Sequence, residues 1–202
     1  MHTAITALVE RMMRSEELLI VGLGDSLTYG WEVERGFFDR FVEILGGRYP
    51  NARIKHHNAG IPGDTADGGF ARLGCLLDLK PDLVIVQFAL NDAFSGIDPR
   101  DFEGSMQSIA ARVLELPAAV ILVTSCALER EHDAAIVRPF YDAIIRMGAQ
   151  LSVPIAQLDR FWSTSALSRS GAVLHNDDGV HPNDQGYALM AEGLLELFEN
   201  DA

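Results

Sequence analysis

The run Leu83-Val84-Ile85-Val86 is apolar at every position. A strand with one face in water would alternate apolar and polar residues, so a continuous aliphatic run indicates a strand that is covered on both faces. Four further candidate strands recur along the chain, separated by helical patterns. The predicted strands cover residues 18–23, 53–57, 83–88, 120–124 and 154–157.

The helical patterns place apolar residues three and four positions apart, as expected for helices that cover the faces of a sheet. The predicted helices cover residues 36–45, 66–79, 101–116, 140–151 and 185–198. Because strands and helices alternate, we expect right-handed crossovers and a three-layer α/β/α sandwich with a mainly parallel, five-stranded sheet. A length of 202 residues suits a single domain over residues 1–202.

The charge balance disfavours two classes of partner. With 29 acidic and 16 basic residues, the net charge of −13 repels phosphate backbones and anionic lipid surfaces. We therefore expect no nucleic-acid partner and no stable membrane association. The N-terminal stretch carries Glu10, Arg11 and Arg14 before any apolar run, unlike a secretory signal, so we expect a cytoplasmic protein.

An N-terminal helix is also indicated, and it carries apolar residues. We expect Ile5, Leu8 and Met12 of this helix to be exposed. Exposed apolar positions leave homo-oligomerisation open.

The first predicted strand leads into Gly24-Asp25-Ser26-Leu27-Thr28. Functional groups in open α/β sheets gather at the carboxyl ends of strands, so a serine on this turn can be an exposed nucleophile. It can equally be a helix cap, and this segment alone does not separate the two. A dinucleotide-binding loop is disfavoured, because Leu27 stands where the third glycine would be and Asp25 would repel a pyrophosphate.

The segment Asp177-Asp178-Gly179-Val180-His181-Pro182 precedes the last predicted helix. Asp178 and His181 lie three positions apart on a turn, which lets a carboxylate meet an imidazole. A serine needs such a base, and the base needs a partner on its other nitrogen. The alternatives are a solvated surface turn and a metal site, for which only His175 is an evident further ligand. We expect neither a metal nor another cofactor.

Two further polar segments follow predicted strands. Asn91 could donate its side-chain amide to an oxyanion. The segment Asn58-Ala59-Gly60-Ile61-Pro62-Gly63-Asp64-Thr65 contains glycines that let backbone N–H groups approach a ligand. Both segments are also ordinary turn or helix-cap sequences.

In this order, the four segments resemble the four blocks of the GDSL or SGNH hydrolase family over almost the whole chain. Gly24-Asp25-Ser26 and the distant Asp178-Gly179-Val180-His181-Pro182 are the specific pair, whereas the other two segments are weak singly. The resemblance implies a flavodoxin-like fold and a carboxylic ester hydrolase. It also implies that Ser26 is the nucleophile, His181 its base, and Asp178 the partner that orients His181.

The resemblance further implies an oxyanion hole, formed by the backbone N–H groups of Ser26 and Gly63 and by the Asn91 side chain. Gly60 stays open as an alternative to Gly63. The family usually has a glycine two residues before the asparagine, whereas this chain has Ala89. That difference bears on the shape of the acyl site.

The substrate is the least determined part of this interpretation. The family includes esterases, thioesterases, lysophospholipases and carbohydrate deacetylases. We expect a small acyl ester with a short acyl chain, because the chain is compact and offers no obvious lid. Trp31 and Phe94 are candidate walls of the substrate site, or else ordinary core residues. The alternative from another class is a catalytically weak ligand-binding protein on the same fold.

Overall fold

The computed structural model describes residues 2–199, and its centre is a five-stranded parallel sheet with strand order β2-β1-β3-β4-β5. The strands are β1 (Glu17–Gly24), β2 (Arg53–Gly60), β3 (Leu83–Gln87), β4 (Ala119–Val123) and β5 (Ile155–Ala156). This order is the flavodoxin-like one, in which the direction of winding reverses between β1 and β3. The predicted α/β fold and parallel sheet are confirmed.

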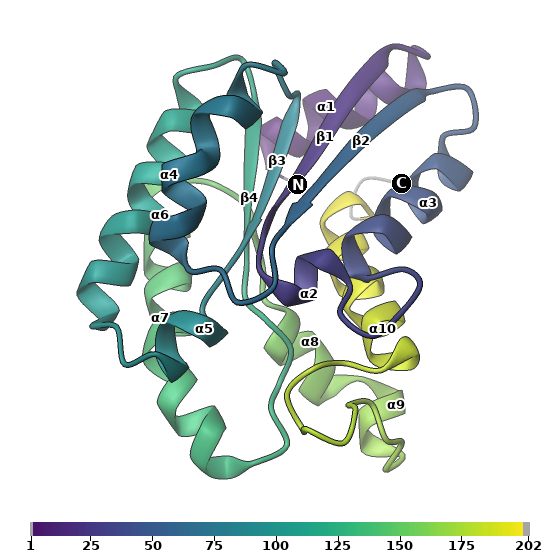
Figure 1. The fold of residues 1–202 in the computed structure, drawn as a ribbon. Helices are drawn as coiled ribbons and strands as arrows, with labels where there is room; N and C mark the ends of the chain where they lie inside the picture. Colours follow the sequence, from purple (N-terminus) through teal and green to yellow (C-terminus); the bar gives the residue numbers. More distant parts are fainter. Residues whose placement is uncertain (1, 200–202) are drawn as a thin grey trace.

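Helices cover both faces of the sheet (Figure 1). One face carries α4, α6 and α7, and the other carries α1, α3 and α10. The longer helices are α1 (Thr3–Met13), α3 (Phe37–Arg48), α4 (Ala66–Leu77), α6 (Pro99–Leu114), α7 (Glu131–Leu151) and α10 (Asp184–Leu195). The short ones are α2 (Ser26–Tyr29), α5 (Leu90–Phe94), α8 (Leu158–Thr164), α9 (Ala166–Arg169) and the 3₁₀ turn η1 (Glu196–Phe198). Among residues 2–199, none of these helices is both long and apolar enough to cross a bilayer.

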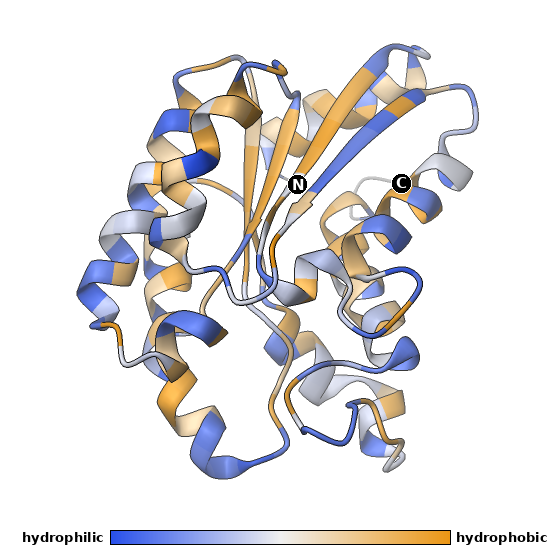
Figure 2. Cartoon of the chain, in the orientation of Figure 1, coloured by the Kyte–Doolittle hydropathy of each residue, from blue (hydrophilic) through white to orange (hydrophobic). Residues whose placement is uncertain are grey.

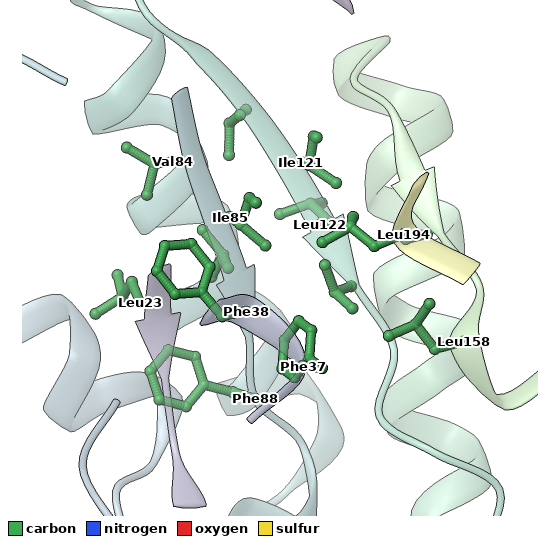
Figure 3. Close-up of a cluster of buried hydrophobic side chains, with 14 of the residues drawn as sticks. Leu23, Phe37, Phe38, Val84, Ile85, Phe88, Ile121, Leu122, Leu158 and Leu194 are labelled. Atoms are coloured by element: carbon green, nitrogen blue, oxygen red, sulfur yellow. The ribbon is translucent and has the colours of Figure 1, made fainter. Parts of the chain in front are cut away.

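The core lies on both sides of the central strands. Every residue of β3 and β4 is buried. In Figure 3, Phe37 and Phe38 from α3 and Leu194 from α10 pack near Ile85 and Leu122 of the sheet. Burial of each such side chain contributes about 1.5–3 kcal/mol. The aliphatic run that begins at Leu83 is therefore the middle of the molecule, as its pattern predicted.

The two edges of the sheet differ. Edge strand β2 exposes Lys55, His56 and His57, and Figure 2 shows it as the most hydrophilic of the longer strands. Polar side chains on an edge discourage pairing with another chain. At the other edge, β5 has only two residues. Neither edge offers a long apolar strand to a partner.

The expectation that the N-terminal helix exposes its apolar residues is wrong. Ile5, Leu8 and Met12 are buried, with exposed fractions of 1%, 6% and 2%. They share one face of α1, and this face packs on β1 and η1. The apolar stripe therefore belongs to the core and no longer supports homo-oligomerisation.

The end of β1 needs a residue without a side chain. A Cβ atom on Gly24 would lie 2.1 Å from Thr28 Oγ1 and 2.5 Å from the backbone oxygen of Gln87. Glycine therefore lets α2 turn back closely against the end of β3. This close approach sets the place of Ser26, the first residue of α2.

Candidate active site

The ends of the neighbouring strands β1, β2 and β3 bring separate polar segments together. In the register of the sheet, Gly24 at the end of β1 is paired with Gly60 of β2 and with Gln87 of β3. Ser26, Gly63 and Asn91 each come shortly after one of these strand ends. The helices that carry Ser26 and Asn91, α2 and α5, lie at the same end of the sheet (Figure 1). The reversal of winding between β1 and β3 leaves room for a ligand there.

Ser26 is directed at an imidazole rather than used as a helix cap. The cap of α2 is Asp25, whose Oδ1 accepts from the backbone N–H of Leu27 at 2.9 Å. Ser26 Oγ lies 2.9 Å from His181 Nε2. The two functions that the sequence left open for this serine are thus divided between neighbouring residues.

Asp178 holds His181 from the other side of its ring. His181 Nδ1 lies 2.5 Å from Asp178 Oδ2, and Asp178 Oδ1 accepts from the backbone N–H groups of Val180 and His181 at 2.9 Å each. Partial burial favours the protonated carboxyl, but these hydrogen bonds outweigh it, so the pKa of Asp178 lies below its usual value. An ionised Asp178 keeps the proton of His181 on Nδ1 and leaves Nε2 free to accept from Ser26.

The loop that carries Asp178 and His181 is a small hairpin. The N–H of Asn176 donates to the His181 oxygen at 2.8 Å, and the N–H of Asn183 donates to the Leu174 oxygen at 2.9 Å. His175, on the same loop, is buried, and its ring nitrogens lie 2.9 Å from the Ala127 oxygen and 3.2 Å from Glu129 Oε1. Within the described residues, no cluster of three or more His, Cys, Asp or Glu side chains could hold a metal.

The candidate oxyanion donors come from three segments that the structure brings together. Across residues 2–199, the backbone N–H groups of Ser26 and Gly63 have no hydrogen-bond partner. Gly63 has φ of +81°, a conformation that favours glycine. Asn91 Nδ2 donates to the backbone oxygen of Asp64 at 2.9 Å, so the amide is held next to Gly63. The N–H of Gly60, by contrast, already donates to Asn58 Oδ1 at 3.0 Å, and this favours Gly63 over Gly60.

The two aromatic candidates differ in position. The rings of Trp31 and His181 have their centroids 6.1 Å apart, so Trp31 lies beside the Ser26–His181 pair. Phe94 ends α5, three residues after Asn91, and is exposed. Both side chains lie outside the core, at 39% and 44% exposure, which argues against the core-packing alternative.

Comparison with known proteins identifies the family of the chain. A model of the GDSL-like lipase/acylhydrolase family matches residues 23–189. The chain belongs to this family. Membership makes the protein a carboxylic ester hydrolase, as the four segments predicted.

Relatives and solved structures show how far this hydrolase resembles known members. The chain is 31% identical over 117 residues to esterase TesA of Pseudomonas aeruginosa, and this alignment spans 57% of each chain. It is 26% identical over 196 residues to thioesterase 1/protease 1/lysophospholipase L1 of Escherichia coli, over 96% of this chain and 89% of that one. A lipase/acylhydrolase structure from Enterococcus faecalis superposes with a TM-score of 0.78 at 23% identity, covering 91% and 96% of the two chains, and supports the fold.

This GDSL-like hydrolase also has a buried polar network that the sequence analysis missed. Asp25 Oδ2 accepts from Gln87 Nε2 at 3.2 Å. The same Gln87 nitrogen lies 3.0 Å from Ser125 Oγ, and Gln87 Oε1 accepts from Thr28 Oγ1 at 2.8 Å. All four side chains are buried beneath the turn that carries Ser26. A local sequence pattern cannot predict such a network, because its members come from three different strand ends.

Ala89 shows what the family's usual glycine does in this fold. Ala89 caps α5 with φ of 146°, a backbone conformation that residues with a side chain rarely adopt. Strain of this kind costs on the order of 1–3 kcal/mol and persists only where the surroundings hold it. The departure from the family pattern thus retains the turn that leads to Asn91 and places a buried methyl group next to it.

Two buried carboxyl groups of the hydrolase have raised pKa values. Burial raises the pKa of Asp25 to about 7, against the opposing hydrogen bonds from Leu27 and Gln87. Burial likewise raises the pKa of Asp92 to about 6, although Asp92 accepts from the N–H of Ala66. Both groups bind a proton more tightly in the folded chain than in the unfolded one.

We expect Asp25→Asn to gain stability relative to the wild type as the pH rises from 5 to 8. In the wild type, the stabilisation by protonated Asp25 is fully present below the unfolded pKa of about 4. It is lost as the pH rises through about 7, the folded pKa. Each pKa unit between the folded and the unfolded value changes the free energy of unfolding by about 1.4 kcal/mol. Urea unfolding at several pH values measures the difference between the two proteins.

Asp92 is present in both proteins, so its own burial affects both, and its charge adds to the raised pKa of Asp25 in the wild type. Asp98→Asn is the matched control, since it alters an exposed cap, on α6, whose Oδ1 accepts from the N–H of Arg100. A difference between wild type and Asp25→Asn that stays constant from pH 5 to 8 would contradict the raised pKa.

Proposed function

We propose that the protein hydrolyses small acyl esters through an acyl-enzyme on Ser26, with His181 as general base and Asp178 as its orienting partner. The observation that carries the proposal is the continuous hydrogen-bonded chain from Ser26 Oγ through His181 to Asp178. A serine hydroxyl is a weak nucleophile until a neighbouring base takes its proton. His181 Nε2 lies 2.9 Å from Ser26 Oγ, within reach of that proton, and this distance supports His181 as the base.

The first half of the reaction acylates Ser26. Oγ bonds to the ester carbonyl carbon while its proton moves to His181 Nε2, and the carbonyl oxygen becomes an oxyanion. The bond to the alcohol then breaks, and His181 gives its proton to the departing alcohol oxygen. Asp178 stabilises the imidazolium that exists between these two steps.

The second half releases the acid. Water gives a proton to His181 Nε2 as its oxygen attacks the acyl carbon, and the collapse of this second intermediate returns the proton to Ser26 Oγ. In both halves the oxyanion would accept from the backbone N–H groups of Ser26 and Gly63 and from the second amide hydrogen of Asn91. The first amide hydrogen donates to the Asp64 oxygen and fixes the amide plane.

The substrate proposal is a short acyl ester bound beside Trp31 and Phe94. Trp31 lies beside His181 and offers apolar surface next to the proposed reacting groups. Phe94, three residues after Asn91, offers a second exposed ring. Because the E. coli relative is named a thioesterase and lysophospholipase, thioesters and lysophospholipids are the first alternatives to test, together with acetylated carbohydrates. A cytoplasmic location and the absence of nucleic-acid partners stay predictions of the sequence.

A catalytically weak ligand-binding protein is the rival function. It is distinguished by Ser26→Ala, which keeps the fold and removes the nucleophile. Wild-type hydrolysis of 4-nitrophenyl butyrate that disappears in this variant supports the enzyme. Equal, negligible turnover by both proteins across acyl esters and thioesters supports the binding protein.

We expect Asn91→Ala to lower kcat about a hundredfold or more and to change KM much less. The lost donor acts on the oxyanion, which exists only in the transition state and intermediates, whereas substrate binding does not require it. Steady-state hydrolysis of 4-nitrophenyl butyrate provides both constants. Asn51→Ala, at an exposed turn before β2, is the control that leaves both unchanged. A rise in KM at constant kcat would assign Asn91 to substrate binding instead.

We expect the acyl-chain optimum to lie at acetyl or butyryl esters. The physical reason is that Trp31 and Phe94 are two exposed rings, which together offer a limited apolar area for the acyl group. Comparing kcat/KM for 4-nitrophenyl acetate, butyrate, octanoate and palmitate measures the preference. Trp31→Ala should reduce this preference for short acyl chains. An optimum at palmitate would overturn the short-chain proposal without affecting the proposed chemistry.

A further inference from the structure

Arg72, on α4, makes three hydrogen bonds in three directions. Its Nε donates to Asp64 Oδ2 at 2.8 Å, its Nη1 to the backbone oxygen of Ala59 at 2.6 Å, and its Nη2 to the backbone oxygen of Gly24 at 3.0 Å. The side chain is 22% exposed, and that of Asp64 is 14% exposed. The guanidinium is therefore fixed between two strand ends and one loop.

These three acceptors belong to the segments that carry the proposed oxyanion donors. Gly24 ends β1, two residues before Ser26, and Ala59 is the penultimate residue of β2. Asp64 directly follows Gly63, and its own backbone oxygen accepts from Asn91. Arg72 thus holds the segment before Ser26 and the segment after Gly63 at a fixed separation. Its partner Asp64 is also the residue whose backbone oxygen accepts the hydrogen bond from Asn91.

The surrounding backbone supports this arrangement. The Gly24 oxygen also accepts from the N–H of Ile61 at 3.0 Å, and the N–H of Asp64 donates to the Ile61 oxygen at 3.1 Å. The loop from Ile61 to Asp64 is therefore fixed at its start by β1 and at its end by Arg72. Gly63, with its positive φ and its unpaired N–H, lies between these two fixed points.

We propose that Arg72 is a positioning residue of the oxyanion hole, which sets the distance between the Ser26 and Gly63 N–H groups without touching the substrate. This inference rests on the proposed function. The shape of the guanidinium matters here as much as its charge, because a planar fork can donate in three fixed directions and an ammonium group on a flexible stem cannot. Small displacements of groups that stabilise a transition state cost large factors in rate.

The test compares Arg72→Lys and Arg72→Gln with the wild type. Arg72→Lys keeps the charge, removes the fork and is the variant expected to stay folded, which circular dichroism and thermal unfolding check. We expect kcat on 4-nitrophenyl butyrate to fall between about tenfold and a hundredfold in both variants, with KM changed less than threefold. The inhibition constant of phenylboronic acid, whose serine adduct is tetrahedral, should rise by the same factor as kcat falls.

Two controls separate positioning from a general loss of structure. Arg146→Gln removes a surface ion pair with Glu103, far along the chain on α7, and should leave kcat and the boronic acid inhibition unchanged. In a double-mutant cycle, Arg72→Lys should cost much less in the Asn91→Ala background than in the wild type, because both changes damage one hole. Fully additive effects would assign Arg72 to the stability of the fold and overturn the proposal.

The possible failures can be told apart. If the wild type hydrolyses the ester, Ser26→Ala does not, and Arg72→Lys keeps the wild-type kcat, the positioning function of Arg72 is wrong while the proposed function stands. If the wild type itself hydrolyses no ester or thioester, the proposed function fails first, and the inference about Arg72 fails with it.

Discussion

The hydrogen bond between Ser26 Oγ and His181 Nε2 joins residues 155 positions apart, and the proposed chemistry depends on it. The parallel sheet makes the contact possible, because the carboxyl ends of all its strands lie on the same side of the sheet. Gly24 permits the close turn into α2, and the hairpin around Asp178 brings the imidazole to meet the serine. The fold thus provides what the local sequence cannot, a fixed distance between two ends of the chain.

The sheet could be predicted because its signals are local. The aliphatic run that starts at Leu83 identifies the strand that the structure places at Leu83–Gln87, and the other strands fall within three residues of their predicted bounds. The helix predicted over 140–151 is longer, at Glu131–Leu151, because Pro139 does not end it. The short helices around Ser26 and Asn91 escaped prediction, since four or five residues carry no periodic pattern.

What the sequence could not provide depends on tertiary contacts. Whether Ile5 is exposed depends on what α1 packs against. The apolar stripe of α1 would look the same in the sequence whether the helix were buried or exposed. Arg72 looks like an ordinary polar residue in the sequence, and Asp25 belongs to the Gly24-Asp25-Ser26 motif without a predicted partner. Their importance arises only when Gln87, Ala59 and Gly24 are brought beside them. The residues proposed to react were easier to identify than those that hold them, because the partners of the supporting residues are far away in the sequence.

A crystal structure after reaction with diethyl 4-nitrophenyl phosphate tests the arrangement most directly. The reagent transfers its phosphoryl group to an activated serine and releases 4-nitrophenolate. We expect the phosphorus on Ser26 Oγ, and its oxygen about 2.7–3.1 Å from the Ser26 and Gly63 nitrogens and from Asn91 Nδ2. Phosphorylation of another residue, or an adduct whose oxygen points away from these three donors, would contradict it.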